Sequence, residues 1–451
     1  MSPSHPCWLL PLVFATTGAP GPAQASYELR DLNTAATYNP QATAPLVDVG
    51  SGRFVFIGYT PSTGYEVFRT QSGENKVELV HELYPGSTSG ITTGTLVQSG
   101  SLVVVAGRSA AGTGFELYKV EWNRLTLIKD IRFGWESSNP RDVVAFTPGV
   151  VLFTAFDNSG QRELWRSDGT EAGTYRLGEL NGLSSADPLD LVTVGTGSAT
   201  RTYFSALAPS GGRELHVSDG TWSGTKLVKD IWPGTGSSDP RDFVDLGWIL
   251  FTANDGTNGR EVWRTDGTQS GTVLVANVGP GSTSGPQTKL HICGSVALFA
   301  TSTHLYQTTG SSTFALQAVQ TPLNSVGRLP TGECLFRGNG ELWITDGSSS
   351  GTKFVADLNP SGSSNPDEFF TADNKVYFRA THESLGSELF TSTGSAASTT
   401  LRIDINRGAG GSAPRFLYTD ASGTYLGGVW GGQSGTLLRM NPNATQVTRV
   451  A

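Results

Sequence analysis

The stretch "GRELHVSDGTWSGTKLVKDIWPGTGSSDPRDF", residues 212–243, has a close copy on either side of it. The upstream copy reads "QRELWRSDGTEAGT" at 161–174, and the downstream copy reads "GREVWRTDGTQSGT" at 259–272. Each copy places a glutamate before an apolar segment, then Asp-Gly-Thr, then a second apolar segment. Related copies recur about every 47 residues, a period typical of repeat architectures in which each copy is one structural unit.

Each unit contains four short segments separated by glycine-rich turns, which predicts four antiparallel strands. The second segment, such as "WILFTA" at 248–253 or "VVLFTA" at 150–155, is apolar on both faces. Such a strand has to be covered on both sides, and a lone sheet cannot do this. Sheets packed face to face around an axis can. We therefore predict an all-β chain that forms a single closed β-propeller of eight or nine four-stranded blades.

The two ends of the chain present two ways to close the ring. Apolar second segments run from "FVFIGY" at 54–59 to "TYLGGV" at 424–429. The segment "YELRDLN" at 27–33 matches the fourth strand of a unit, and "TQVTRVA" at 445–451 matches the same strand. The two segments compete for one closing position, and the sequence does not decide between them.

The composition supports the all-β prediction and excludes some classes of partner. The chain of 451 residues has 57 glycines, and only 16% of its residues are charged. Glycine supplies the positive φ angles of tight turns, while β-branched and aromatic residues suit strands. A net charge of −8 argues against a nucleic-acid-binding face and against docking on anionic membranes. We also expect no transmembrane segment, since no apolar run approaches about 20 residues.

Residues 1–25 have the pattern of a secretory signal peptide, with an apolar run and small residues at Ala23 and Ala25. A disordered tail or a misplaced start is the alternative. We expect residues 26–451 to form the propeller of a monomeric protein that is secreted, periplasmic or on the cell surface. An exported chain could join Cys293 and Cys334 in a disulfide. The alternative is two small buried hydrophobic residues.

The motifs resemble those of a known bacterial family. "ELWRSDGTEAGT" at 163–174, "EVWRTDGTQSGT" at 261–272 and "ELWITDGSSSGT" at 341–352 are similar to the ELWxxDGT-repeat proteins. The resemblance covers nearly everything after residue 26. It implies export and a propeller-like fold, and it transfers no catalytic residues.

Two sets of repeated acids have a structural and a functional interpretation. The Asp-Gly-Thr acids could ligate metal, but a tight turn explains them better, because two copies keep the glycine after a threonine, Thr309-Gly310 and Thr393-Gly394. The strand glutamates could form a ring of carboxylates. We expect instead that each accepts backbone N–H bonds from its own preceding loop. The turn acids are Asp168, Asp219, Asp266 and Asp346, and the glutamates include Glu163, Glu214 and Glu261.

A third set of acids stands two residues after proline at the start of the innermost strand. These acids are Asp142, Asp190, Asp242 and Glu368. We expect them at the mouth of the central channel, where their oxygens could hold Ca²⁺, the one cofactor that the sequence suggests. We favour the alternative, in which each acid binds the backbone of its neighbour.

Aromatic residues in the predicted loops between blades are candidates for binding a ligand. They are Tyr84, Phe133, Trp135 and Trp232. Exposed rings on a rigid rim can stack on sugars or anchor a protein, and the alternative is that they pack beneath the loops. The sharper hypothesis is that Trp135 and Trp232 are exposed.

The common enzyme motifs are not found, including His-Glu-x-x-His, the P-loop and Gly-x-Gly-x-x-Gly. We therefore expect a non-catalytic module that binds a protein or a glycan. One alternative is a glycan-active hydrolase or lyase that uses carboxylates at the channel mouth, and another is a structural component of the cell envelope.

Overall fold

The computed structural model describes residues 30–31, 41–42, 46–71, 77–182, 184–279, 281–282, 284–319, 323–406, 410–420, 423–430, 433–440 and 447–449. The predicted signal peptide, residues 1–25, lies outside these residues. The described part contains nine antiparallel sheets, which we number in chain order. Helix is limited there to two 3₁₀ turns, Gly197–Ala199 and Ala396–Ser398. No helix of the described part is long and apolar enough to cross a membrane.

The first five sheets run from the N-terminal side to the middle of the chain. Sheet 1 consists of β2 (Gln41–Ala42), β3 (Val47–Gly50), β4 (Arg53–Thr60), β5 (Gly64–Gln71) and β6 (Val77–His81). Sheet 2 consists of β7 (Val97–Ser99), β8 (Leu102–Ser109), β9 (Thr113–Glu121) and β10 (Arg124–Lys129). Sheet 3 consists of β11 (Arg141–Ala145), β12 (Val151–Phe156), β13 (Arg162–Ser167) and β14 (Tyr175–Arg176). Sheet 4 consists of β15 (Leu189–Val194), β16 (Arg201–Leu207), β17 (Arg213–Ser218) and β18 (Lys226–Lys229). Sheet 5 consists of β19 (Arg241–Asp245), β20 (Ile249–Asn254), β21 (Arg260–Thr265) and β22 (Val273–Ala276).

The last four sheets complete the chain. Sheet 6 consists of β23 (His291–Cys293), β24 (Val296–Ala300), β25 (Leu305–Thr308) and β26 (Thr313–Gln317). Sheet 7 consists of β27 (Gly327–Arg328), β28 (Cys334–Gly338), β29 (Glu341–Thr345) and β30 (Lys353–Ala356). Sheet 8 consists of β31 (Asp367–Ala372), β32 (Lys375–His382), β33 (Gly386–Ser392) and β34 (Thr400–Ile403). Sheet 9 consists of β35 (Arg415–Asp420), β36 (Gly423–Trp430), β37 (Gln433–Met440) and β38 (Val447–Arg449), joined by β1 (Arg30–Asp31).

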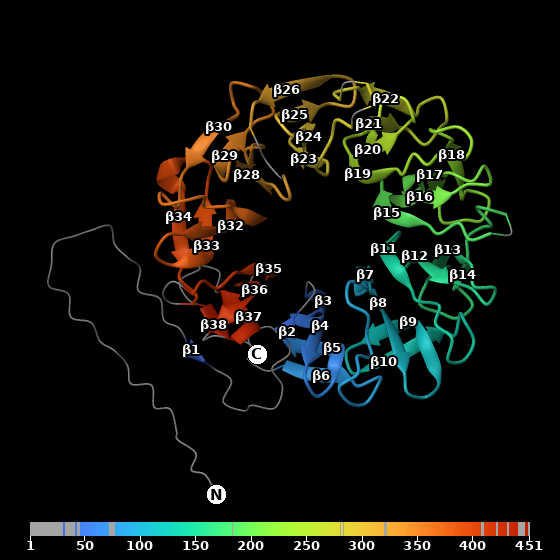
Figure 1. Ribbon diagram of the computed structural model, residues 1–451. Helices are drawn as coiled ribbons and strands as arrows, with labels where there is room; N and C mark the ends of the chain where they lie inside the picture. The colour runs from blue at the N-terminus through green and yellow to red at the C-terminus, as the bar shows by residue number, and fades with distance from the viewer. Residues whose placement is uncertain are drawn as a thin grey trace, which may run out of the picture.

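The nine sheets follow one another around a common centre (Figure 1). In Figure 1 the first strands, such as β11, β15 and β19, lie toward the centre, and the fourth strands lie at the periphery. Within each of sheets 2 to 8 the strands pair in chain order. This radial arrangement of four-stranded sheets is β-propeller-like, and the number of sheets is the larger of the two that the sequence predicted.

The second strand of each sheet is buried on both faces, and β12 shows how. Phe153 packs in one cluster with Leu102 and Val104 of sheet 2. Its neighbour Leu152 points to the other face and packs with Phe204 of sheet 4. Sheets 2 to 8 each contribute to two such apolar clusters, one on either face. Burying one such side chain stabilises the fold by roughly 1.5–3 kcal/mol. The prediction that these segments are covered from both sides is confirmed.

Both terminal segments join sheet 9. β38 pairs antiparallel with β37 as the fourth strand, and β1 pairs parallel with the outer edge of β38. The expectation that the two segments compete for one position is therefore wrong. A fourth strand leaves an open outer edge, and β1 uses this edge.

Cys293 and Cys334 are joined by a disulfide, with Cα atoms 5.9 Å apart. Cys293 ends β23 in sheet 6, and Cys334 begins β28 in sheet 7. Both side chains are buried within the same apolar cluster between these sheets. The bond therefore links two consecutive sheets covalently as well as by packing.

Replacing both Cys293 and Cys334 by alanine should lower the free energy of unfolding by about 2–4 kcal/mol, because the bond closes a loop of 41 residues in the unfolded chain. Urea unfolding of the full chain with and without reductant measures this. Reductant should shift the midpoint of the native protein and leave that of the double variant unchanged. Labelling of both Cys293 and Cys334 by an alkylating agent without reductant would show that the bond does not form.

Candidate functional site

The acid of each Asp-Gly-Thr turn bonds within its own turn. Asp168 Oδ1 accepts hydrogen bonds from Thr170 N (3.0 Å) and Thr170 Oγ1 (2.6 Å). The bond from the threonine hydroxyl holds the pKa of Asp168 below its ordinary value. The same contacts recur at Asp219, Asp266 and Asp346. These contacts agree with the turn interpretation of the motif.

The glycine of the turn meets two separate requirements. Gly220 has a φ of +80°, and a Cβ built on it would lie 2.5 Å from Phe146 Cε1 of sheet 3. Gly310 and Gly394, which follow threonine instead of aspartate, also have positive φ and closely packed neighbours in the preceding sheet. The glycine is therefore needed for the turn and for the packing between sheets, which explains why these copies keep it while losing the acid.

Gly220→Ala should destabilise the protein by about 2–4 kcal/mol, since an alanine has to adopt a positive φ and displace Phe146. Gly234→Ala is the matched control, because Gly234 has a φ of +90° and a Cβ added to it would meet nothing within 4 Å. Gly234→Ala should lower the free energy of unfolding by about 1–2 kcal/mol, because it adds only the backbone strain of an alanine at positive φ. Equal losses in urea unfolding would show that packing against the preceding sheet contributes nothing.

The strand glutamates hold the loops that lead to the next sheet. Glu116 accepts hydrogen bonds from Ile131 N (3.1 Å) and Ser138 N (2.9 Å). Glu214 accepts equivalent bonds from Ile231 N (2.7 Å) and Ser238 N (3.1 Å). The expected partners in the preceding loop are thus wrong. The third strand begins beside the point where the fourth strand ends, so the carboxylate reaches the following loop.

Six of these glutamates are fully buried: Glu66, Glu116, Glu163, Glu214, Glu261 and Glu388. Burial raises the pKa of Glu163 to about 7. Its Oε1 accepts a hydrogen bond from Ala186 N (3.1 Å), while its buried Oε2 has no hydrogen-bond partner in the described part of the chain. Glu163 is therefore held with less compensation than Glu116, both of whose oxygens accept N–H groups.

The stability of the protein should fall as the pH rises from 4.5 to 7. The unfolded chain releases the Glu163 proton near pH 4.5, while the folded protein keeps it up to about pH 7, so the folded state binds more protons between these values. Glu163→Gln should reduce the difference in the free energy of unfolding between pH 4.5 and pH 8 by on the order of 3 kcal/mol, as measured by urea unfolding.

Glu116→Gln should reduce the pH dependence as well, because burial raises the pKa of Glu116 to about 7 too. It should in addition destabilise the protein at both pH values, because its NH₂ group would face an N–H donor. Identical pH dependences for the native protein and Glu163→Gln would contradict the prediction.

The acids after proline begin the innermost strands β11, β15, β19 and β31 in a left-handed conformation. Asp142, Asp190, Asp242 and Glu368 have φ angles of +51°, +57°, +60° and +55°. The strand register shifts at each of them, as in a β-bulge. Asp242 Oδ2 accepts a hydrogen bond from Thr252 Oγ1 (3.1 Å) on the second strand of its own sheet. For Asp242 this side-chain partner replaces the backbone of a neighbour that we expected.

These acids influence one another across sheets 3 to 5. Partial loss of water raises the pKa of Asp142 and of Asp190, and the negative charges of Asp242 and Asp142 raise that of Asp190 further. No three His, Cys, Asp or Glu side chains in the described residues are placed to hold a metal ion. The calcium site stays a prediction, with no ligand set in this part of the chain.

Sequence analysis missed an arginine network beside these acids. Arg162 Nη1 donates to Asn139 O (2.9 Å), and Arg213 Nη1 donates to Asp187 O (2.7 Å). Asp187 also binds Arg141 Nη2 (2.7 Å) and Arg213 Nη2 (3.0 Å). An arginine precedes the strand glutamate in three consecutive copies, at 162, 213 and 260, and this was the available signal. The network fixes the left-handed residues before proline at the inner ends of sheets 3 to 5.

The four predicted rim aromatics divide into two pairs. Phe133 and Trp135 are 71% and 72% exposed. Tyr84 is half-buried, with Arg108 Cζ 4.5 Å from its ring centroid. Trp232 is half-buried as well and lies flat against glycine backbone, since a Cβ on Gly236 or Gly256 would overlap its ring. Of the two tryptophans expected to be exposed, the structure exposes Trp135 and packs Trp232.

The two loops that carry these tryptophans are aligned residue for residue, "IRFGWESS" at 131–138 and "IWPGTGSS" at 231–238. Where the second loop packs Trp232 on Gly236, the first has an ion pair between Arg132 and Glu136 (2.9 Å). The ion pair thus takes over the place of the packed tryptophan, and the folding of the first loop leaves Phe133 and Trp135 facing solvent.

The loop that presents Phe133 and Trp135 is held at several points. Beyond the two bonds to Glu116, Gly134 N donates to Asp130 Oδ2 (3.1 Å) and Phe133 N donates to Asn158 Oδ1 (3.0 Å). The turn between the rings needs Gly134, whose φ is +76°. The backbone that carries the two rings is therefore held in place, with both rings exposed.

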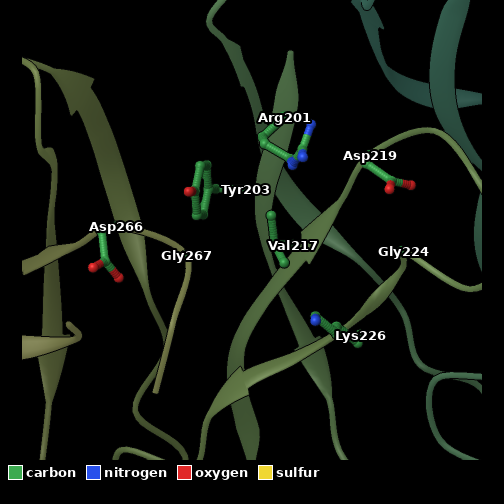
Figure 2. Close-up of a pocket in the computed structure, with 8 residues that line it drawn as sticks. All are labelled: Arg201, Tyr203, Val217, Asp219, Gly224, Lys226, Asp266 and Gly267. Atoms are coloured by element: carbon green, nitrogen blue, oxygen red, sulfur yellow. The ribbon is translucent and has the colours of Figure 1, made fainter. Parts of the chain in front are cut away.

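A polar pocket lies at the opposite ends of the strands, on the side of the Asp-Gly-Thr turns (Figure 2). Figure 2 shows Tyr203 of sheet 4 directed toward Asp266 of the next turn, and Arg201 of the same strand directed toward Asp219. Lys226 and Asp219 complete the charged lining of the pocket. Tyr203 replaces the leucine of the neighbouring copies, Leu152 and Leu250, and sequence analysis did not single it out.

Comparisons with known proteins give only distant similarity. No family model matches the chain, and no curated protein matches it. Among solved structures, the chain is similar to a puromycin hydrolase (TM-score 0.39, 12% identity, 87% of this chain and 58% of that one). It is also similar to a prolyl endopeptidase (0.42, 10%, 90% and 55%) and to TolB from Acinetobacter baumannii (0.30, 13%, 68% and 63%). The chain thus spans less than two thirds of the length of each of these proteins.

Proposed function

We propose that the chain is an exported, single closed β-propeller of nine blades that binds a protein or a glycan without catalysing a reaction. The pairing of β1 with β38 supports closure, because the chain crosses from sheet 9 to sheet 1 between β1 and β2. The disulfide between Cys293 and Cys334 supports export, since such bonds persist in oxidising compartments. The family resemblance of the repeats agrees with both points.

One observation carries the binding function: the exposed pair Phe133 and Trp135. The equivalent positions of the aligned loop are Pro233 and Thr235, so the loop fold does not require large rings there. Two rings exposed to solvent lose apolar contact that a folded protein ordinarily gains, and exposed aromatics on a well-held loop are characteristic of binding sites. The ligand-binding face in this proposal is the one formed by the loops between sheets.

Glycan and protein arrays probed with the full chain, with and without Ca²⁺, test this function. We expect a bound ligand whose signal falls at least tenfold (roughly 1.4 kcal/mol) in the variant Phe133→Ser/Trp135→Thr. Trp222→Gln is the matched control, because Trp222 is 53% exposed on a turn at the opposite ends of the strands. A ligand lost equally in both variants would contradict the assignment of the face.

The glycan-active alternative has one observation in its favour. Asp190 is exposed, and its pKa is raised partly by Asp142 and Asp242, as a general acid requires. Release of reducing ends from any polysaccharide by the native chain, abolished by Asp190→Asn, would replace the non-catalytic proposal. Arrays without any ligand would favour the structural envelope component.

A further inference from the structure

We infer that the ligand of the Phe133–Trp135 pair is an uncharged sugar chain, whose ring faces stack on the two aromatic rings. This inference rests on the proposed binding function and narrows its ligand from two classes to one. Three properties of the loop support it: the size of the apolar surface, the charge around it and the way in which the rings are held.

The apolar surface is too small for the core of a protein interface. A stable interface buries about 800 Å² on each partner around an apolar centre. One aromatic side chain has roughly 150–250 Å² of surface, and Phe133 and Trp135 are 71% and 72% exposed, so the two rings supply roughly 210–360 Å², less than half of this area. Among the residues described, the other exposed large apolar side chains lie on strands or turns away from this loop, for example Phe314 and Phe354 on the outer strands of sheets 6 and 7. Two adjacent rings are sufficient for the faces of one or two sugar units.

The groups around the rings are polar, and the two charged side chains that flank them neutralise each other. Arg132 and Glu136, the residues that flank Phe133 and Trp135, form an ion pair with each other (2.9 Å). The Glu136 side chain is 65% exposed, and Asn158 beside Phe133 is exposed too. Carboxylate, guanidinium and amide groups bond sugar hydroxyls in the plane around a stacked ring. The other carboxylate at the loop, Asp130, is half-buried and accepts a hydrogen bond from Gly134 N. No exposed, unpaired charge of the loop therefore selects an anionic or a cationic ligand.

The backbone of the loop is also held in place before any ligand arrives. Both ends of the loop are bound to Glu116, and its middle is bound to Asp130 and Asn158. Hydroxyl-rich ligands exchange contacts with water for contacts with the protein, so each sugar unit gains little binding free energy. A site for them therefore benefits when the protein loses little conformational entropy on binding. A prearranged loop provides this condition.

Affinity electrophoresis of the full chain tests the inference with defined probes. The gels contain hydroxyethyl cellulose, laminarin, dextran or galactomannan as neutral polymers, and polygalacturonate or chitosan as charged ones. We expect at least one neutral polymer to retard the native chain. Trp135→Ala should weaken this retardation at least tenfold, and Trp222→Ala should leave it within twofold of the native value. Thermal unfolding of both variants should match the native protein, because both side chains are exposed.

Each other outcome has a definite meaning. Retardation by charged polymers alone overturns the uncharged ligand and leaves the binding function in place. If no polymer retards the chain, but a photo-crosslinker at position 135 joins it to a protein partner whose binding is lost in Phe133→Ser/Trp135→Thr, the sugar inference fails and the binding function stands. Retardation that survives Trp135→Ala overturns the inference and moves the site elsewhere. No retardation together with no crosslinked partner removes both.

Discussion

The double-sided burial of the second strand is the constraint on which the rest of the molecule depends. Leu152 and Phe153 are consecutive residues that pack into clusters with sheets 4 and 2. Because side chains alternate across a strand, consecutive apolar residues oblige the sheet to have a neighbour on each face. Repeating this requirement nine times produces the succession of sheets in Figure 1. The turns, loops and candidate sites all take their positions from this succession.

Two further elements secure the contacts between sheets. The glycine of each Asp-Gly-Thr turn packs on the sheet before it, as Gly220 does on Phe146. The buried glutamate at the start of each third strand binds the loop that leads to the sheet after it, as Glu116 does through Ile131 and Ser138. Each repeat thus contacts the preceding sheet through its turn glycine and the loop to the following sheet through its buried glutamate. Both are carried by the motif that first reveals the repeat in the sequence.

Much of the architecture could be predicted from the sequence, because period and apolar pattern are properties of single segments. The all-β class, four strands for each unit and the burial of the second strand follow from such patterns. The direction in which Glu116 reaches was predicted wrongly, since a spacing along the chain does not say which of two loops lies nearer in space. The places of the two terminal segments in sheet 9 were not predicted, for a related reason. Pattern matching assigned both to a fourth strand and gave no sign that a fifth could be added.

The candidate sites were less predictable than the fold. Trp232 packs on Gly236, four residues further along its loop. The aligned position in the other loop is Glu136, which pairs with Arg132, and Trp135 is exposed there. An aromatic residue in a loop gives the same local signal in both cases. The arginine network escaped notice because its members come from different sheets. Arg141 and Arg213 meet at Asp187, and the three residues are far apart in the sequence.

Because each loop is attached to a buried carboxylate mainly through its backbone, the exposed side chains of the loop are not needed to hold it in place. The bonds to Glu116 use only backbone N–H groups and a serine, so the side chains between Ile131 and Ser138 are not committed to them. The loop at 231–238, held in the same manner by Glu214, has a different set of side chains between its anchors. Because the anchors are the same, the side chains between them can change without altering the contacts that hold the loop. A new recognition surface can therefore arise in one loop without rebuilding the sheets beneath it.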